Sequence, residues 1–422
     1  MLRVVNYNID QDTQGKTGVP GADMTMVLQA IGNAHLAGNA QPIDVLALEE
    51  LYQTKTTTLQ PIVAALNAIY PTAHYVFDTT TDATTGNTLT GNGESGLIYN
   101  ANTVQLLGAL SVGSASGSGA PRAPMRYKLA PKGYNDHSAD FFLYVSHMKS
   151  GSDASDMTRR NVEANTIRTN SNTAAVGANA HVIYSGDLNL NDSSEAAYQT
   201  MISGTLSGIG ATGQGIDVLN YGNNWNTTST YKGLFTEEAT FDEYRDDFQL
   251  VTSPMISQPG MQLVPGSLTA FGNGGNIYHQ SVASASNSAA LVDLGQAPYD
   301  ANYRSNVLMA LTTVTDHLPM VADYSYATAV EAPGDFDHSG VVNAADYTLW
   351  RNTFGSTTSL AADADHDGVV DMADYVIWRD NTTGSGSGAS LDFSTQVPEP
   401  STLLLVLSGV GVVFQLRGQR LR

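Results

Sequence analysis

Acidic, amide and histidine side chains lie beside several apolar runs of this chain, in a combination suited to chemistry at phosphorus. Hydrolysis of a phosphate ester needs a metal ion on the phosphoryl oxygen, a base for the attacking water and proton donors for the charge that develops. The residues that could supply these groups are Asn8, Glu50, His147, Asp187, Asn189, Asp247, Asp316 and His317. Their joint occurrence predicts a metal-assisted hydrolytic site.

The oxygen donors of this set are expected to bind a metal ion and to position water. Glu50 and Asp316 are hard carboxylate ligands of the kind that Mg²⁺ or Mn²⁺ prefers. Asp187 and Asn189 are two residues apart, so an extended backbone brings both side chains to the same side. Such a pair can hold a water molecule or a second metal ion while it orients the phosphate.

The two histidines are candidates for contact with the phosphate. His147 and His317 titrate near neutral pH and can donate hydrogen bonds to non-bridging oxygens. Asp247 could pair with His317 and hold its tautomer. For each residue alone the ordinary alternative stands, because a histidine at a strand end is usually solvated and Thr-Asp-His is a helix-cap signal. Only the whole set favours catalysis.

Apolar runs of the strand type are expected to carry these residues to one edge of a folded sheet. They are RVVNYNID, DVLALE, FFLYVSH, HVIYSG and VLMALTTVTDH. Apolar residues at helical spacing predict helices in MTMVLQAIGNAHL, LQPIVAALNAIY and DMTRRNVEANTIRT. Strands interspersed with helices favour an α/β fold built as a layered sandwich.

The charge of the chain limits its partners. The formal net charge is −21, from 19 basic and 40 acidic side chains. A protein this acidic has no basic field for tight non-specific binding of nucleic acid, although a bound divalent metal changes the local sign. Basic residues near the predicted site could still hold a nucleic-acid backbone, or could be ordinary surface charge with Arg159 or Arg160 packed inward. They are Arg122, Arg126, Lys128, Lys149, Arg159 and Arg160. Cysteine is absent, which excludes disulfides and thiolate metal sites.

A repeated acidic motif begins after Ala332. GDFDHSGVVNAADYTLWRNTFG recurs as ADADHDGVVDMADYVIWRDNTTG, with oxygen donors at loop positions 1, 3, 5, 7, 9 and 12 and glycine at position 6. This is the spacing of an EF-hand calcium loop, in which position 7 supplies a backbone carbonyl. The predicted Ca²⁺ ligands are Asp335, Asp337, Ser339, Val341, Asn343 and Asp346 in the first copy, and Asp363, Asp365, Asp367, Val369, Asp371 and Asp374 in the second.

Residues 1–329 are similar to the endonuclease/exonuclease/phosphatase superfamily, the deoxyribonuclease-I-like proteins. The similarity runs through NYNI, ALEEL, APRAPMRYKL, VSHMKSGSDASDMTRRNVEA, YSGDLNLND, YRDDFQLV and TDHLPMVADY. The resemblance implies a four-layer α/β sandwich of two packed mixed sheets, with the site at their shared rim.

The resemblance also implies roles for individual residues. Asn8, Glu50 and Asp316 would bind Mg²⁺, and Asp187 and Asn189 would position the water and the phosphate. His147 and His317 would contact the scissile phosphate, Asp247 would support His317, and Arg122 would clamp a phosphate oxygen. Glu49 stands where the family often has glutamine, and Glu94 is a candidate carboxylate partner of His147.

The C-terminal quarter resembles two further families. Residues 334–383 resemble a type I dockerin domain, a small all-α EF-hand-like unit that folds on two Ca²⁺ ions and docks to a cohesin-like protein. A flexible linker is expected at 384–396. Residues 397–422 combine Val-Pro-Glu-Pro, an apolar run and terminal arginines, and so resemble the PEP-CTERM sorting tails of exported Gram-negative proteins. The chain shows no signal peptide, which such proteins normally carry.

Together these features predict an exported or cell-surface, monomeric, metal-dependent phosphoesterase with a C-terminal envelope anchor. Nucleic acid is the first substrate hypothesis. The alternatives are a phospholipid or inositol phosphoesterase, and a non-enzymatic surface scaffold that acts through its dockerin-like domain.

Overall fold

The computed structural model divides the chain into a large unit that ends near residue 332 and a small unit that begins at Pro333. It describes residues 1–10, 21–51, 55–80, 93–133, 137–173, 176–177, 179–203, 213–219, 224–237, 240, 243–257, 259–326, 333–337 and 342–382. The linker and tail predicted at 384–422 lie outside the described residues, as do Ser339 and Val341 of the first calcium loop.

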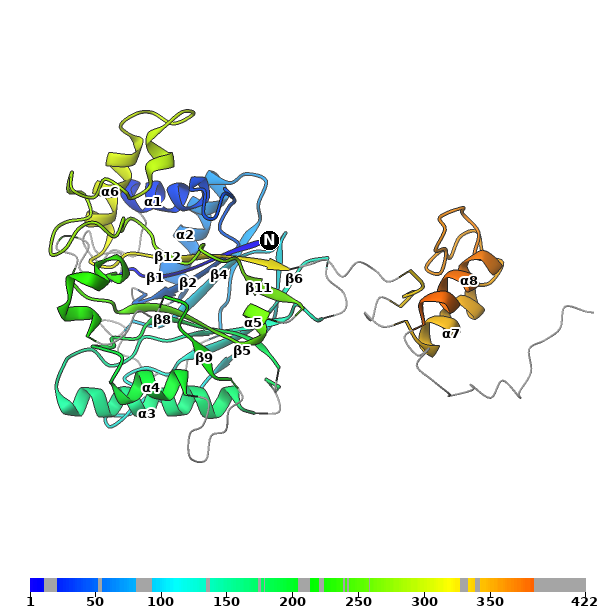
Figure 1. Cartoon of the computed structure of the whole chain (residues 1–422), viewed down its shortest axis with the longest axis horizontal. Coiled ribbons are helices and arrows are strands. Elements are labelled where there is room, and N and C mark those ends of the chain that lie inside the picture. The colour runs from blue at the N-terminus through cyan, green and yellow to red at the C-terminus, as the bar shows by residue number, and fades with distance from the viewer. Residues whose placement is uncertain are drawn as a thin grey trace, which may run out of the picture. The chain divides into compact units, whose positions relative to one another are not determined.

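Two mixed sheets form the centre of the large unit (Figure 1). The first sheet has the order β11-β13-β1-β2-β4-β3, and β12 also pairs with β13. Its strands are β1 (Leu2–Asn8), β2 (Val45–Glu49), β3 (Tyr75–Phe77), β4 (Gly96–Asn100), β11 (Met261–Leu263), β12 (Thr269–Ala270) and β13 (Met320–Tyr326). Only the β1–β2 pair of this sheet is parallel, and the other pairs are antiparallel.

The second sheet has the order β5-β6-β7-β8-β10-β9. Its strands are β5 (Val104–Ser111), β6 (Met125–Pro131), β7 (Phe141–Val145), β8 (His181–Asp187), β9 (Gly215–Ile216) and β10 (Asp247–Thr252). Strands β7 and β8 are parallel, and α3 (Ala154–Ser171) connects them along the chain. The parallel pair therefore follows the usual rule that such strands need a crossover helix.

Helices cover the outer face of each sheet, so the large unit has four layers (Figure 1). On the first sheet lie α1 (Ala22–Asn33), α2 (Lys55–Ile69) and α6 (Tyr303–Val314). On the second lie α3 and α4 (Ala196–Ile202). Shorter elements are α5 (Pro254–Ser257), η1 (Trp225–Thr227), η2 (Ser229–Leu234) and η3 (Val292–Gly295). The predicted layered α/β sandwich is confirmed.

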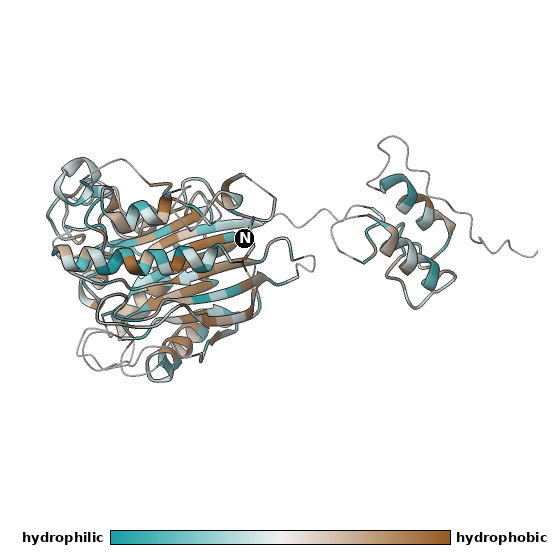
Figure 2. Cartoon of the chain, turned by 90° about the horizontal axis from the view of Figure 1, so that it is seen from below, coloured by the Kyte–Doolittle hydropathy of each residue, from teal (hydrophilic) through white to brown (hydrophobic). Residues whose placement is uncertain are grey.

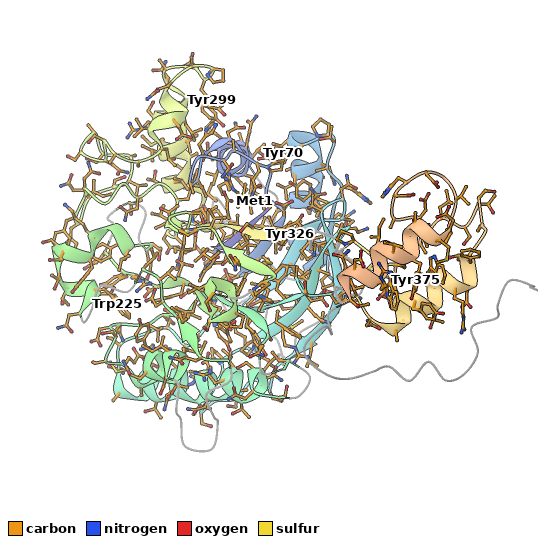
Figure 3. The ribbon with its side chains drawn as sticks, turned by 45° about the vertical axis from the view of Figure 1, so that its right-hand side comes forward. Met1, Tyr70, Trp225, Tyr299, Tyr326 and Tyr375 are labelled. Carbon is orange, nitrogen blue, oxygen red and sulfur yellow. The ribbon has the colours of Figure 1, made fainter. Side chains whose placement is uncertain are left out.

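Strand periodicity separates the hydrophobic residues into three buried clusters. In β1, Val4 points between the two sheets, whereas Val5 and Tyr7 point toward α1 and α6. Successive strand residues face opposite sides, so one apolar run contributes to two layers of the core. Figure 2 shows the hydrophobic colour concentrated in the strands of the large unit. Trp225, labelled in Figure 3, lies in the third cluster, on the outer face of the second sheet.

One element was assigned wrongly from the sequence. VLMALTTVTDH was expected to be a strand that ends in Asp316-His317, but most of it belongs to helix α6, which ends at Val314. Its buried residues, Val307, Leu308, Ala310, Leu311 and Val314, recur at helical spacing. Asp316 and His317 lie in the connection between α6 and β13.

The small unit consists of two loop–helix repeats. Helix α7 (Ala344–Thr353) and helix α8 (Met372–Asn381) each begin with a reciprocal capping box, formed by Asn343 with Asp346 and by Asp371 with Asp374. Aromatic rings pack between the helices. The ring centroids of Trp350 and Tyr375 are 5.0 Å apart, and Figure 3 marks Tyr375. Trp350 and Trp378 are both buried in this packing.

Candidate active site

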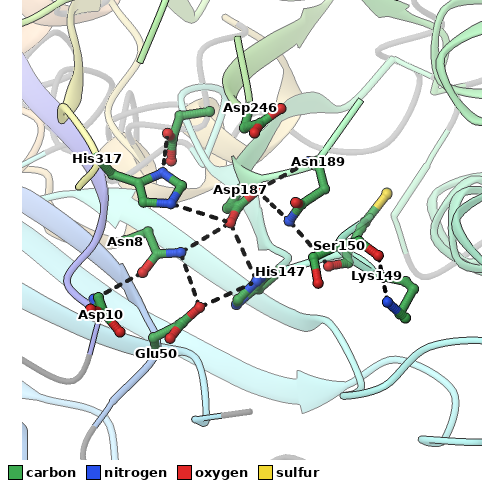
Figure 4. A network of polar contacts seen from close by, with 12 residues as sticks. Asn8, Asp10, Glu50, His147, Lys149, Ser150, Asp187, Asn189, Asp246 and His317 are labelled. Atoms are coloured by element: carbon green, nitrogen blue, oxygen red, sulfur yellow. Dashed lines mark hydrogen bonds and ion pairs between the residues drawn. The ribbon is translucent and has the colours of Figure 1, made fainter. Parts of the chain in front are cut away.

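The rim at one end of the two sheets gathers nearly all of the predicted site residues. Strand β1 ends at Asn8 and β8 ends at Asp187, while β10 begins at Asp247, directly opposite Asp187 in the antiparallel register. His147 follows β7, which is parallel to β8. These elements therefore place their polar ends at the same edge, and Figure 4 shows the resulting network.

Asp187 lies at the centre of this network and is buried. Its Oδ2 accepts a hydrogen bond from Asn8 Nδ2 (3.0 Å), and lies 3.3 Å from His147 Nε2 and 3.9 Å from His317 Nε2. Its Oδ1 accepts from Asn189 Nδ2 at 2.6 Å. Burial raises the pKa of Asp187 to about 8, although the charge of His317 opposes this rise. The carboxylate is therefore held in a position where a bound cation would favour its charged form.

Asn189 orients Asp187 through two contacts. Its backbone N–H and its side-chain Nδ2 both donate to Asp187 Oδ1, and Nδ2 also donates to the Met148 carbonyl at 3.3 Å. The turn that makes this possible has a left-handed backbone at Asn189, with φ of 51°. Asparagine tolerates this conformation better than most residues. The predicted Asp187–Asn189 pair is thus brought together.

His317 is held by Asp247, as the sequence predicted. Its Nδ1 lies 2.7 Å from Asp247 Oδ2, and both residues are buried. Burial alone lowers the pKa of His317, but the carboxylates of Asp247, Asp187 and Glu237 outweigh it and raise this pKa well above its ordinary value. His317 is therefore a cation near neutral pH, with Nε2–H directed toward Asp187.

His147 is neutral, unlike His317, and it contacts Arg122 rather than the expected Glu94. Burial, together with the Arg122 guanidinium, lowers its pKa well below the ordinary value. Arg122 Nη2 lies 2.9 Å from His147 Nε2, and since a guanidinium can only donate, Nε2 accepts and the imidazole proton is on Nδ1. That Nδ1 has no hydrogen-bond partner within the described part of the chain, so Glu94 does not hold it.

Glu49 and Glu50 have different environments although they are adjacent. Glu50 has a left-handed backbone (φ of 57°) and extends into the site, where its Oε1 lies 3.6 Å from His147 Nε2. Glu49 is fully buried, and neither of its carboxyl oxygens has a hydrogen-bond partner among the residues that the structure describes. Burial raises the pKa of Glu49 well above its ordinary value, so its neutral form is favoured. Glu50 is thus placed at the site, and its role as a metal ligand stays a prediction.

Asn8 presents its amide nitrogen, rather than its oxygen, to the carboxylates. Its Nδ2 donates to Asp187 Oδ2 and contacts Glu50 Oε1 at 3.5 Å, while its Oδ1 accepts from the Asp10 backbone N–H at 3.0 Å. For Asn8 to bind a metal ion through Oδ1, the amide must rotate and release Asp10. The predicted ligand is at the site, but it is not in the orientation of a ligand.

Asp316 belongs to a second acidic group on the same rim. Ligand atoms of Asp316, His317 and Glu237 lie within 4.8 Å of one another, whereas Asp316 has no direct contact with Asn8 or Glu50. Sequence reasoning missed Glu237, which comes from a loop rather than from a strand end. It is joined to His317 by an isolated β-bridge. Nothing in TEEAT distinguishes Glu237 from ordinary surface acid.

The residues present fit a divalent metal ion. Glu50 Oε1 and Asp187 Oδ2 both face Asn8 Nδ2 and His147 Nε2 within 3.6 Å. Two buried carboxylates that lie close together repel each other, and a hard cation between them removes this repulsion. Mg²⁺ needs only one or two protein carboxylates as ligands. Glu50 and Asp187 would hold it, and Glu237 with Asp316 offers a second carboxylate pair.

The six predicted basic residues separate into two sets. Arg160 is fully buried and pairs with Glu195 at 2.6 Å, so it is the arginine of its pair that packs inward. Lys128 pairs with Asp140 at 2.8 Å, and Arg126 donates to Asn170 Oδ1. The others, Arg122, Lys149 and Arg159, line one pocket.

The calcium loops bring predicted ligands together in both repeats. Carboxylate oxygens of Asp335, Asp337 and Asp346 cluster within 4.8 Å, and so do those of Asp363, Asp365 and Asp374. Asp346 and Asp374 are fully buried. In the second loop Gly368 has φ of +90°, the sharp turn that glycine at position 6 allows. Asn343 and Asp371 cap α7 and α8, while Asp367 accepts from Val369 N–H at 2.8 Å.

Comparison with known proteins identifies the small unit. Residues 333–379 match the Dockerin type I domain, which confirms the predicted resemblance to this domain. No curated protein matches the chain in sequence. No helix in the described part of the chain is both long and apolar enough to cross a membrane.

Three of the solved structures to which this chain is similar are the following. The catalytic domain of human nocturnin with bound sulfate is 16% identical and has a TM-score of 0.42, with 77% of this chain and 94% of that chain covered. An endonuclease/exonuclease/phosphatase from Bacteroides vulgatus is 14% identical, with a TM-score of 0.43 and coverage of 77% and 98%. The mannosyl-6-phosphatase of Bacteroides thetaiotaomicron is 14% identical, with a TM-score of 0.41 and coverage of 77% and 100%.

Proposed function

We propose that the large unit is a metal-dependent phosphodiesterase, with nucleic acid as its first candidate substrate. The observation that carries this proposal is the environment of Asp187 Oδ2, which faces Asn8, His147 and His317 within 3.9 Å. One buried carboxylate is thus surrounded by an amide, a neutral imidazole and a charged imidazole. Attack of water on a phosphate ester needs such a set of proton donors and acceptors.

Four side chains have assigned parts in the proposed reaction: Glu50, Asp187, His317 and Arg122. Glu50 and Asp187 would hold the metal ion, which would supply Lewis-acid polarisation of a phosphoryl oxygen and would offset its charge. His317 Nε2 and Asp187 Oδ2 are 3.9 Å apart, too far for a direct hydrogen bond, but a water to one side of both can contact each of them at hydrogen-bond distance. We assign that position to the attacking water, which accepts a hydrogen bond from His317 Nε2–H and donates one to Asp187 Oδ2, the acceptor for its proton. Arg122 donates to a non-bridging oxygen, a role for which the guanidinium fork is suited.

The test uses the full chain and supercoiled plasmid, with Mg²⁺ or with EDTA. We expect nicking with Mg²⁺, none with EDTA, and a loss of at least about 100-fold for Asp187→Asn, as for removal of a catalytic acid–base group. Asp300→Asn, on an exposed turn, is the matched control and should keep the wild-type rate. If the folded protein does not nick plasmid, the nuclease proposal fails, and activity on phosphatidylcholine vesicles or inositol phosphates would identify the alternatives.

We propose that the dockerin unit attaches this enzyme to a cohesin-like partner outside the cell, at the cell surface or in an extracellular complex. The match at 333–379 supports this proposal, because dockerin domains bind cohesins. Native gels of the full chain with a cohesin domain test it. A complex in Ca²⁺ that dissociates with EGTA is expected. Asp363→Ala removes a ligand of the second loop and should weaken the complex, while leaving plasmid nicking unchanged.

A further inference from the structure

A pocket beside the candidate active site is lined by three basic side chains. Its volume is about 350 Å³, and its lining residues are Ala115, Ser116, Gly117, Pro121, Arg122, Lys149, Ser150 and Arg159. This volume is within the range of about 300–1,000 Å³ that is usual for small-molecule sites. Three cations and no carboxylate line this pocket, although the whole chain has a net charge of −21.

Arg122 connects the pocket to the reacting centre. Its side chain forms part of the pocket wall, and its Nη2 contacts His147 Nε2 at 2.9 Å. Lys149 and Ser150 follow His147 along the chain, and Figure 4 shows them beside it. A ligand in the pocket is therefore next to the group that we assign to the scissile phosphate.

The other two cations are held in place by neighbouring groups, of which Arg159 has two. Arg159 donates from Nε to the Gly119 carbonyl at 2.8 Å and from Nη2 to the Ser116 carbonyl at 3.2 Å. Both carbonyls belong to the connection between β5 and β6, and Arg159 is on α3. Its Nη1 has no acceptor among the described residues. The basic wall is therefore preorganised, which reduces the entropy lost when an anion binds.

Lys149 is held beside one carboxylate. Its Nζ pairs with Asp156 Oδ1 at 3.1 Å and donates to the Ser150 carbonyl. Asp156 itself does not line the pocket. An ammonium has three protons, so Lys149 can direct one to a ligand without losing either contact.

We propose that this pocket binds a second phosphate of the substrate, the one next to the scissile phosphate. The inference rests on the proposed function and narrows it to substrates with neighbouring phosphates, such as a nucleic-acid strand. A phosphomonoester or a phospholipid with one phosphate leaves the pocket empty. Lys149 and Arg159 are specificity residues in this scheme, and Arg122 joins the two phosphate positions.

The experiment compares three small substrates with the full chain and Mg²⁺. The dinucleotide TpT has one phosphodiester, whereas pTpT and TpTp add a terminal phosphate on the 5′ or the 3′ side. We expect the wild type to prefer one of these two over TpT by about tenfold in kcat/KM, the effect of a single charge-assisted contact.

Two variants with opposite expected effects on this substrate preference test whether Lys149 binds the second phosphate. Lys149→Gln should reduce the preference for pTpT or TpTp over TpT to less than threefold in kcat/KM. The hydrolysis of TpT itself should be unchanged. Asp156→Asn removes the neighbouring anion and should increase the preference. Far-ultraviolet circular dichroism establishes that both variants are folded.

The outcomes separate the two proposals. Hydrolysis of TpT without any preference for pTpT or TpTp overturns the pocket assignment and leaves the phosphodiesterase intact. An equal loss by Lys149→Gln on all three substrates also overturns it, because the lysine would then support the fold or the chemistry alone. If none of the three is hydrolysed, the phosphodiesterase proposal fails and the pocket inference fails with it.

Discussion

Glu49 and Glu50 illustrate how strongly the environment of a single residue decides its role. Both are carboxylates at the end of β2, and their sequence positions alone made Glu50 only the better candidate. Glu50 extends to within 3.6 Å of His147, whereas Glu49 is buried and the described part of the chain offers neither of its oxygens a hydrogen-bond partner. A buried carboxyl of this kind stays neutral, and glutamine has nearly the same shape.

These environments predict opposite effects for two substitutions of the same type. Glu49→Gln should keep Mg²⁺-dependent phosphodiester hydrolysis within about threefold of wild type, because the neutral acid and the amide are alike in charge and size. Glu50→Gln should lower kcat by at least about 100-fold and weaken Mg²⁺ binding, because an amide is a poorer ligand for a hard cation. Activity against Mg²⁺ concentration measures both. A greater loss for Glu49→Gln would reverse the assignment of the ligand.

Asp247 should control the charge of His317. Asp247→Asn removes the carboxylate that keeps the pKa of His317 high, so the imidazole loses its proton at lower pH. Since the proposed mechanism needs His317 protonated, activity is lost as pH rises through that pKa. We expect the alkaline limb of the kcat–pH profile to move to lower pH and kcat to fall about 10–100-fold. An unchanged alkaline limb would mean that another group sets it.

At the residue scale, the sequence predicted which types of side chain meet at the candidate site, but it did not predict how each side chain is oriented there. Asp187, Asn189 and Asp247 came together because each is at or next to a strand end, and the direction of a strand end follows from periodicity. His317 instead reaches the site from the connection between α6 and β13. The rotation of the Asn8 amide depends on the Asp10 N–H, which no pattern encodes. Glu237 reaches the site from a loop, so periodicity could not identify it.

At the scale of elements, the rim depends on how closely β7, β8 and β2 approach one another. Gly186, in β8, has φ of +122°. A Cβ at this position would lie 2.1 Å from the Ser146 carbonyl and 2.8 Å from Glu49 Oε1. Only glycine allows this approach, and the next residue is Asp187. The sequence Ser-Gly-Asp is therefore a packing requirement as well as part of the site.

Gly186→Ala should destabilise the large unit and reduce activity together. The backbone conformation and the clash each cost roughly 1–3 kcal/mol. Gly133→Ala is the matched control, since it also has positive φ (+79°) but no atom within 4 Å. It should cost only about 1–2 kcal/mol and leave kcat unchanged. Thermal unfolding and kcat give the comparison, and equal destabilisation of the two variants would argue against close approach as the cause.

Asp44 joins three elements and gives the fold a pH dependence. It accepts hydrogen bonds from the Arg3 backbone N–H of β1 (2.8 Å) and from Thr103 Oγ1 after β4 (2.6 Å). Burial raises its pKa from 3.8 to about 6, so the native state binds more protons than the unfolded state between these values. The contribution of Asp44 to stability therefore decreases as pH rises from about 4 to 6.

Asp44→Asn should remove this dependence. The amide oxygen can accept from Arg3 and the amide nitrogen can donate to Thr103, so both hydrogen bonds are retained. The variant should gain stability relative to wild type as pH rises, to about 3 kcal/mol above pH 6. Urea unfolding at pH 4 to 7, followed by fluorescence of Trp225, measures the difference. A difference that does not change with pH would show that Asp44 is not the titrating group.

The spacing of apolar residues along each run decides whether the run forms a strand or a helix. Strands β1, β2, β7 and β8 were predicted because short, β-branched and aromatic runs end in polar residues. The run before Asp316-His317 is also apolar and contains β-branched residues, although no aromatic one. Its buried residues recur every three or four positions, and it forms α6. Composition and polar ending were therefore insufficient, and the helical period decided the structure.

At the scale of the whole molecule, two units share one chain, and we propose a different metal requirement for each. The small unit has few buried hydrophobic residues, and its two loops bring together carboxylates that repel one another. A domain of this size usually needs a metal ion or another cross-link to be stable. The large unit has three buried clusters of its own and needs no such support. The repeat predicted this division from sequence, because a tandem calcium motif is readable without a fold.

Calcium removal should therefore unfold the small unit alone. Differential scanning calorimetry of the full chain in Ca²⁺ should show two transitions, and EGTA should abolish or lower only the smaller one. Trp350 and Trp378 report on the small unit and Trp225 on the large one, so Trp225→Phe assigns the fluorescence change. Plasmid nicking in Mg²⁺ with EGTA should continue at the wild-type rate. If EGTA instead lowers both transitions and stops nicking, then the catalytic unit also depends on calcium, and the acidic pair Glu237–Asp316 becomes the first candidate for that ion.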